Sequence, residues 1–190
     1  QPGTPAGASA SRCSGGAHSR RSPTRNARNS RSGVGPQVAE NAAATAAFAQ
    51  CLEALGIPYL YVNAPQKLQR GEALLPTGVE EYGNESADAF LEELERQGTD
   101  YVDLRPLFEE NGIYSNWFFR TDHHWKPEAA FFAWQALTDE LEGRYGLAAD
   151  PALTDPANWD TRVLEHFFLG SQGKRVGSLY AGVDDIEIWK

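Results

Sequence analysis

The sequence predicts an α/β protein, and the order of the segments between residues 38 and 145 carries that prediction. Segments with helical periodicity alternate with short apolar segments of strand length, in the order helix, strand, helix, strand, strand, helix. Helices that alternate with buried strands build a mainly parallel sheet with helices on its faces. The 190 residues, of which 41% are hydrophobic, suffice for one domain with a substantial core.

The first helix is predicted over residues 38–55. Its larger apolar residues, among them Phe48, Leu52 and Leu55, are three or four positions apart, so they share one face that we expect to be buried. The apolar segment 57–62 follows as a short strand. A helix followed by a buried strand is half of a parallel α/β unit.

A second helix and strand follow a surface loop. We expect Ser86 to cap this helix, because a serine side chain accepts a hydrogen bond from a free backbone N–H at a helix start. The apolar residues Phe90, Leu91 and Leu94 form its inner face. Residues 101–104 make the next strand, so this stretch repeats the first unit.

The aromatic segment 116–119 favours another strand. Pro127 then opens a long helix, because proline is tolerated in a first helical turn. Phe131 and Trp134 belong to the predicted inner stripe of that helix. Residues 122–125 therefore lie between a strand end and a helix start, where ligands and chemistry gather in open α/β sheets.

Asp122 and His124 are the candidate catalytic pair. Alternate residues of an extended chain face the same way, so these two side chains share one side while His123 points to the other. A carboxylate beside an imidazole fixes the tautomer of the ring and stabilises its protonated form. The spacing is that of the supporting half of a catalytic triad.

Three interpretations of this cluster are open at this point. In the first, the histidines are merely hydrogen-bonded in a polar turn that ends a buried aromatic strand. In the second, Asp122 and His124 bind a metal ion together with the distant His166. In the third, His124 is a general base and Asp122 orients it, but a short Asp-x-His pattern does not choose among the three.

A strand over residues 161–169 and a closing strand flank a Gly-rich segment, residues 170–177. We expect this segment to be a turn that presents Lys174 and Arg175 to solvent or to an anionic group. It lacks the Gly-Lys-Ser/Thr ending of a phosphate-binding loop. Ser171 lies in it as a possible nucleophile, but no pattern of a strained nucleophile elbow surrounds that serine.

Charge is distributed unevenly. Residues 1–36 contain six arginines and no acid, so they carry a charge of +6. Because the net charge of the whole chain is −9, residues 37–190 carry −15. We expect residues 1–36 to be a disordered basic leader, and they lack the apolar core of a signal peptide. The acidic domain is not expected to bind nucleic acid, and no segment is apolar enough to span a membrane. Because the chain has no methionine, we expect it to be a piece of a longer protein.

Several segments resemble the bacterial DHHW family. Residues 119–125 (Phe-Arg-Thr-Asp-His-His-Trp) contain its signature. The other similar segments are residues 64–67, 101–105, 170–177 and 184–186. This family is similar to the alginate O-acetylation proteins, whose shorter signature is Asp-x-His-Trp. The resemblance covers about residues 38–190 and implies a three-layer α/β/α fold of the SGNH-hydrolase type, in a permuted order that places the Asp and His before the serine.

The resemblance implies that Asp122 orients the general base His124 in a Ser-His-Asp triad that moves or removes acetyl groups on an exported polysaccharide. The relatives have their serine well downstream of the histidine, so we expect it beyond this chain, which would be incomplete at its C-terminus and inactive alone. The expected substrate-binding residues are Arg120, His123, Trp125, Lys174 and Arg175.

No metal or other cofactor is expected. The implied partners are a polysaccharide and an acyl donor, and the implied location is the bacterial cell envelope or periplasm. The alternative is a carbohydrate-binding or scaffolding domain that keeps the same fold without catalysis.

Overall fold

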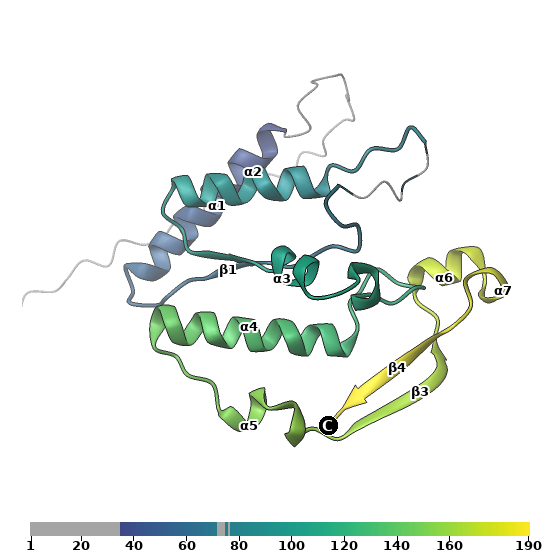
Figure 1. The fold of residues 1–190 in the computed structure, drawn as a ribbon. Helices are drawn as coiled ribbons and strands as arrows, with labels where there is room; N and C mark the ends of the chain where they lie inside the picture. The colour runs from purple at the N-terminus through teal and green to yellow at the C-terminus, as the bar shows by residue number, and fades with distance from the viewer. Residues whose placement is uncertain (1–34, 72–74, 76) are drawn as a thin grey trace, which may run out of the picture. The chain divides into compact units, whose positions relative to one another are not determined.

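Two parallel strands, β1 and β2, lie between layers of helices (Figure 1). The computed structural model describes residues 35–71, 75 and 77–190, which belong to one unit that extends from Gly33 to Lys190. In chain order the elements are α1 (Pro36–Glu53), β1 (Tyr61–Asn63), α2 (Gly83–Arg96), β2 (Tyr101–Asp103), α3 (Arg105–Glu110), the 3₁₀ helix η1 (Tyr114–Trp117), α4 (Pro127–Tyr145), α5 (Pro151–Thr154), the 3₁₀ helix η2 (Pro156–Asn158), β3 (Thr161–Phe168), α6 (Ser171–Val176), α7 (Ser178–Ala181) and β4 (Asp184–Trp189).

The strand pair confirms the predicted α/β arrangement. Tyr61 of β1 lies opposite Tyr101 of β2, and Asn63 lies opposite Asp103. Side chains alternate across a strand, so Tyr101 packs against buried residues of α1 and α2 while Val102 packs against a cluster that includes α4. Helices therefore cover both faces of the pair, as Figure 1 shows.

Helix α1 forms where it was predicted but buries a different face. Its buried residues are Ala42, Ala46 and Ala49. Phe48 is 55% exposed and Leu55 is 69% exposed, so the predicted inner face was wrong. The small alanine side chains let α1 approach α2 closely, and close packing decides which face is buried.

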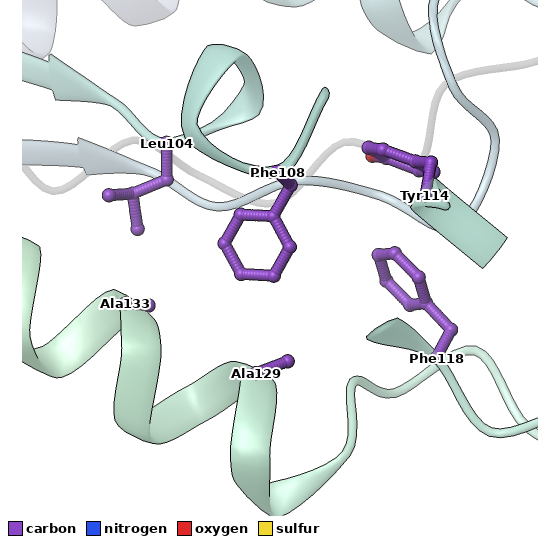
Figure 2. Close-up of a cluster of buried hydrophobic side chains, with 6 residues drawn as sticks. All are labelled: Leu104, Phe108, Tyr114, Phe118, Ala129 and Ala133. Carbon is purple, nitrogen blue, oxygen red and sulfur yellow. The ribbon is translucent and has the colours of Figure 1, made fainter. Parts of the chain in front are cut away.

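The larger buried cluster joins the end of β2 to α4, and Phe108 lies at its centre. The ring of Phe108 is fully buried and points toward Ala129 of α4 (Figure 2). Trp117 and Trp125 pack edge-on against it, with ring centroids 5.4 and 5.5 Å from that of Phe108. Trp134, predicted to face inward, is 40% exposed instead. The cluster consists of Leu104, Phe108, Tyr114, Phe118, Ala129 and Ala133.

The aromatic segment before the Asp-His pair, predicted as a strand, forms η1 instead. Phe118 and Trp125 then meet in a single antiparallel bridge. Inside that bridge the N–H of Phe119 donates to the carbonyl of His124 at 3.1 Å. Residues 119–125, which we call the motif loop, therefore fold back as a narrow hairpin loop and do not continue an extended strand.

Strands β3 and β4 pair as an antiparallel hairpin, which confirms the two strands predicted there. Trp189 stacks on Phe131 of α4, with ring centroids 4.7 Å apart, and so attaches the hairpin to α4. The Gly-rich segment 170–177 was predicted as a turn but forms the short helix α6, and α7 follows it before β4. Gly173 is buried in α6, and a Cβ atom at this position would lie 2.7 Å from the side chain of Thr121, so the close packing requires glycine.

Arg105, the first residue of α3, ties the sheet to α2. Its guanidinium is buried and lies 2.6 Å from Asp103 and 2.7 Å from Asp88. Asn63 donates to Asp103 at 2.9 Å from the neighbouring strand. Burial raises the pKa of Asp103, but hydrogen bonds from Arg105 and Asn63 outweigh that effect and leave the pKa lowered. The ion pair is therefore intact at neutral pH.

The disordered leader was predicted over residues 1–36, and residues 1–34 of it lie outside the described residues, so that expectation stays a prediction. Among the helices that the structure describes, none combines the length and apolar character needed to cross a membrane.

Candidate active site

Asp122 is buried in the motif loop, with 3% of its surface exposed. One carboxylate oxygen accepts the N–H of His124 at 3.0 Å, and the other accepts the N–H of Ser171 at 2.6 Å. Burial raises the pKa of Asp122, but these backbone hydrogen bonds and those of the two side chains outweigh it and hold the pKa below its usual range. Asp122 is therefore an anion at neutral pH.

His124 presents one ring nitrogen to Asp122. Its Nδ1 forms the predicted hydrogen bond with Oδ1 of that carboxylate. An ionised carboxylate only accepts hydrogen bonds, so Nδ1 carries the proton and Nε2 of the neutral ring keeps a free lone pair. The His124 side chain is 65% exposed, and Nε2 has no hydrogen bond to another described residue. This is the orientation of the base in a catalytic triad.

His123 also faces Asp122, contrary to the predicted alternation. Its Nδ1 lies 3.3 Å from Oδ1 of Asp122 and 3.4 Å from Oγ of Ser171. The rings of His123 and His124 lie side by side, with centroids 4.0 Å apart. The alternation expectation was wrong because the motif loop is a hairpin turn, in which neighbouring side chains can point the same way.

Thr121 attaches the motif loop to α6 and β4. The N–H of Gly170 donates to its hydroxyl at 2.9 Å, and the N–H of Gly173 donates to its carbonyl at 2.8 Å. The hydroxyl of Thr121 in turn donates to Asp184 at 2.6 Å. Thr121 is 1% exposed, so these contacts hold the residue next to Asp122 in one buried position.

Sequence reasoning missed Lys67 as a residue of this site. Its ammonium donates to the backbone carbonyls of Phe119, Arg120 and Asp122 at 2.8 to 2.9 Å. The segment that contains Lys67 had been noted only as part of the family resemblance. Contacts from a side chain to backbone carbonyls of a distant loop leave no pattern of residue types that could have identified it.

The predicted substrate-binding residues differ in their surroundings. Trp125 is half-buried against Phe108, so its ring belongs mainly to the core. Arg120 is exposed, and its guanidinium lies so close to Gly182 that a side chain there would overlap it. Lys174 and Arg175 are exposed on α6, and their side chains have no hydrogen bond or ion pair with another described residue. A role in substrate binding stays a prediction for all of them.

Asp122, His123 and His124 also form a group of possible metal ligands, with their ligand atoms within 4.8 Å of one another. One carboxylate and two imidazoles suit zinc. However, Nδ1 of His124 is already hydrogen-bonded to one oxygen of Asp122, and the other oxygen accepts the N–H of Ser171, so both oxygens of this carboxylate have partners. His166, the third ligand of the metal interpretation, lies on β3 beside Asp185 and is not part of this group.

The α/β layers and the buried acid beside an exposed histidine define an SGNH-hydrolase-like domain. The chain belongs to the family described as SGNH hydrolase-like domain, acetyltransferase AlgX, whose model matches residues 24–171. This confirms the predicted resemblance to the alginate O-acetylation proteins. No curated protein matches the chain significantly.

Solved structures share the fold. PatB1 of Bacillus cereus is 17% identical with a TM-score of 0.66, over 83% of this chain and 53% of that chain. The O-acetyltransferase domain of Pseudomonas putida AlgJ is 19% identical with a TM-score of 0.63, over 84% and 60%. A DHHW family protein from Eubacterium siraeum is 17% identical with a TM-score of 0.54, over 82% and 48%. The chain thus spans about half to three-fifths of the length of these proteins.

Proposed function

We propose that this domain supplies the Asp and His of a Ser-His-Asp O-acyltransferase or acetylesterase that acts on a polysaccharide of the bacterial cell envelope. The hydrogen bond between Asp122 and Nδ1 of His124 carries the proposal, because it leaves Nε2 free and exposed to accept a proton. Membership of the AlgX acetyltransferase family supports an acetyl group as the group that is transferred.

The nucleophile is proposed to come from outside these 190 residues. Among the described serines, Ser171 has its hydroxyl within hydrogen-bond distance of a histidine ring of the motif loop. Its partner is Nδ1 of His123, and the same nitrogen also faces Asp122. A triad needs the orienting acid and the nucleophile on opposite nitrogens of one ring. Ser171 and His123 do not have that arrangement. A serine from elsewhere, placed at Nε2 of His124, would have it.

The proposed reaction has two steps. The serine oxygen attacks the acetyl carbonyl while Nε2 of His124 takes its proton, and that proton passes to the departing alcohol as an acetyl-serine forms. In the second step His124 takes a proton from a sugar hydroxyl or from water, which attacks the acetyl-serine. The protonated ring then returns the proton to the serine. Asp122 stays ionised throughout and stabilises the imidazolium that forms in each step.

The polysaccharide is proposed to lie along the exposed side of the motif loop. Arg120, His123, Lys174 and Arg175 are exposed there or on the adjoining helix α6, so their donors are available to sugar oxygens. Trp125 is half-buried and packs against Phe108, so only part of its ring is available to a sugar. An acyl donor as partner and an extracytoplasmic location belong to the same proposal, and membership of the AlgX family supports them.

The test compares acetyl release from a chromogenic ester by the 190-residue chain and by the whole protein that contains it. We expect activity in the whole protein and a background rate in the chain alone. His124→Ala should reduce kcat of the whole protein by about 10³-fold or more. His123→Gln is the matched control in the neighbouring ring and should reduce it by less than about 10-fold.

Two outcomes would overturn the assignment. Activity of the 190-residue chain that disappears with Ser171→Ala would place the nucleophile in α6. Activity of the whole protein that survives His124→Ala but not His123→Gln would exchange the roles of the two histidines.

The second candidate function is a carbohydrate-binding domain without catalysis. The observation in its favour is that none of the described serines forms a hydrogen bond with the ring of His124. In that case the whole protein would bind polysaccharide, release no acetate from any acetylated form of it, and lose binding when Lys174 and Arg175 are replaced.

A further inference from the structure

Lys67 lies four residues after β1 and reaches across to the motif loop. Its ammonium donates to the carbonyls of Phe119 at 2.8 Å, Arg120 at 2.9 Å and Asp122 at 2.9 Å. It also lies 3.1 Å from the side-chain oxygen of Gln172 in α6. An ammonium has three N–H donors, and here all of them are directed at the motif loop and the helix that adjoins it.

Asp184, the first residue of β4, binds backbone amide groups of the same loop. Its carboxylate accepts the N–H of Arg120 at 3.2 Å and the N–H of Thr121 at 2.7 Å. The loop therefore directs three carbonyls to a cation and two amides to an anion. Burial lowers the pKa of Lys67, and the negative charges of Asp184 and Asp122 oppose that effect.

We propose that Lys67, acting together with Asp184, is the positioning residue of this active site. It fixes the backbone of the motif loop so that the Asp122 carboxylate meets Nδ1 of His124. The hydrogen bonds of Lys67 to described residues go to backbone carbonyls and to Gln172 and not to either histidine ring, so its effect on the rings passes through the backbone. The inference rests on the proposed function, because positioning matters for catalysis only if Asp122 and His124 carry it.

The geometry favours a positioning role over a general contribution to stability. The carbonyl of Asp122 itself is one of the acceptors of Lys67. Without the cation, the three carbonyls would lose their common donor and the loop could rotate about Asp122. A shift of about 1 Å in a catalytic group can reduce a rate by 10²-fold. The core clusters around Phe108 and Leu94 do not include Lys67, so they should be unaffected.

The first experiment measures amide hydrogen exchange by NMR on the 190-residue chain with Lys67→Met. Methionine keeps the length of the side chain and removes its charge and donors. We expect exchange at least about 10-fold faster at the amides of His124 and Ser171, which both donate to Asp122. The amide of Leu94, buried in α2, should exchange at its original rate.

The matched control is Lys126→Met. Lys126 is a half-buried lysine next to the motif loop, and its side chain has no hydrogen bond to another described residue. It should leave exchange at His124 and Ser171 unchanged. Exchange that becomes faster at Leu94 as much as at His124 would show that Lys67 is a general stabiliser. Unchanged exchange at His124 and Ser171 would remove Lys67 from the site.

The second experiment measures acetyl transfer by the whole protein. Lys67→Met should lower kcat by about 10- to 10²-fold and leave KM within about 3-fold, because the substrate contacts remain while the base loses its orientation. Failure of this inference is distinct from failure of the proposed function. If His124→Ala inactivates the protein while Lys67→Met does not, only the positioning role is lost. If His124→Ala leaves activity intact, the proposed function falls.

Discussion

Gly170 lies so close to Asp122 that a side chain at this position would overlap that of Asp122 and lie 2.6 Å from the carbonyl oxygen of Thr121. The two residues are far apart in the sequence, and the hydrogen bond from Ser171 to Asp122 depends on their contact. The backbone of Gly170, with φ −71° and ψ 179°, is one that any residue adopts. Space, and not conformation, therefore requires glycine here.

Gly170→Ala should consequently separate α6 from the motif loop. We expect a loss of about 1–3 kcal/mol in the free energy of unfolding, because the added methyl group overpacks a buried contact. Urea unfolding measures it. Gly143→Ala is the control: Gly143 is exposed in α4 with nothing within 4 Å, and alanine should stabilise that helix by up to about 1 kcal/mol. Equal stability of the two variants would contradict the close contact.

Asp122→Asn should change how stability depends on pH. The folded pKa of Asp122 is lowered, so its contribution is complete above the unfolded value of about 3.9 and is lost as pH falls toward the folded value. Between these values the unfolded state binds one more proton than the folded state. Stability of the unmodified chain should therefore fall with decreasing pH by up to about 1.4 kcal/mol per unit from this group alone.

Urea unfolding between pH 2.5 and 6 tests this dependence. Asp122→Asn should be less stable at pH 6 and should have a shallower decrease below pH 4, by up to one proton. Asp139→Asn, at an exposed acid of α4 without a hydrogen bond to another described residue, is the matched control and should keep the original slope. An unchanged slope in the Asp122 variant would mean that its hydrogen bonds do not favour the ionised form.

The proposed catalytic pair could be found from the sequence because only one residue separates its members. Asp122 and His124 also precede a proline-initiated helix, and both signals are local. The direction of His123 could not be found, since alternation holds only for extended chain and the motif loop is a hairpin. Lys67 and Asp184 bind that loop mainly through backbone groups, which look alike at every position of a sequence.

The start of α2 and the buried face of α1 are two further features that the sequence did not predict correctly. Ser86 was predicted to cap α2, but the helix begins at Gly83 and the Glu81 carboxylate accepts the N–H of Asn84 at 3.1 Å. Glutamate is not a typical helix cap. Glu81 accepts this hydrogen bond because the preceding loop places its carboxylate beside the first turn of α2. Similarly, the alanines of α1 are buried while Phe48 is exposed. Small side chains on the face toward α2 let the two helices pack closely, and a phenylalanine on that face would hold them apart.

Arg105→Met should destabilise the fold more than any surface change. The substitution leaves Asp103 half-buried without its main partner, and removal of one member of a buried ion pair costs about 3–5 kcal/mol. Arg70→Met is the matched control. Arg70 pairs with Asp88 from the surface at 3.0 Å, with 48% of its side chain exposed, and its removal should cost less than about 1 kcal/mol.

Urea unfolding of both variants and of a double variant separates charge from packing. If the unpaired carboxylate causes the loss, Asp103→Asn in the Arg105→Met background should restore part of the stability. The stability changes caused by substitutions at two residues in contact do not simply add. If the double variant is as unstable as the sum of the two single variants, the loss comes from the contacts of Arg105 with α2. The contacts of Arg105 with Asp88 at 2.7 Å and with the Asn84 carbonyl at 3.2 Å would then be what connects α2 to the sheet.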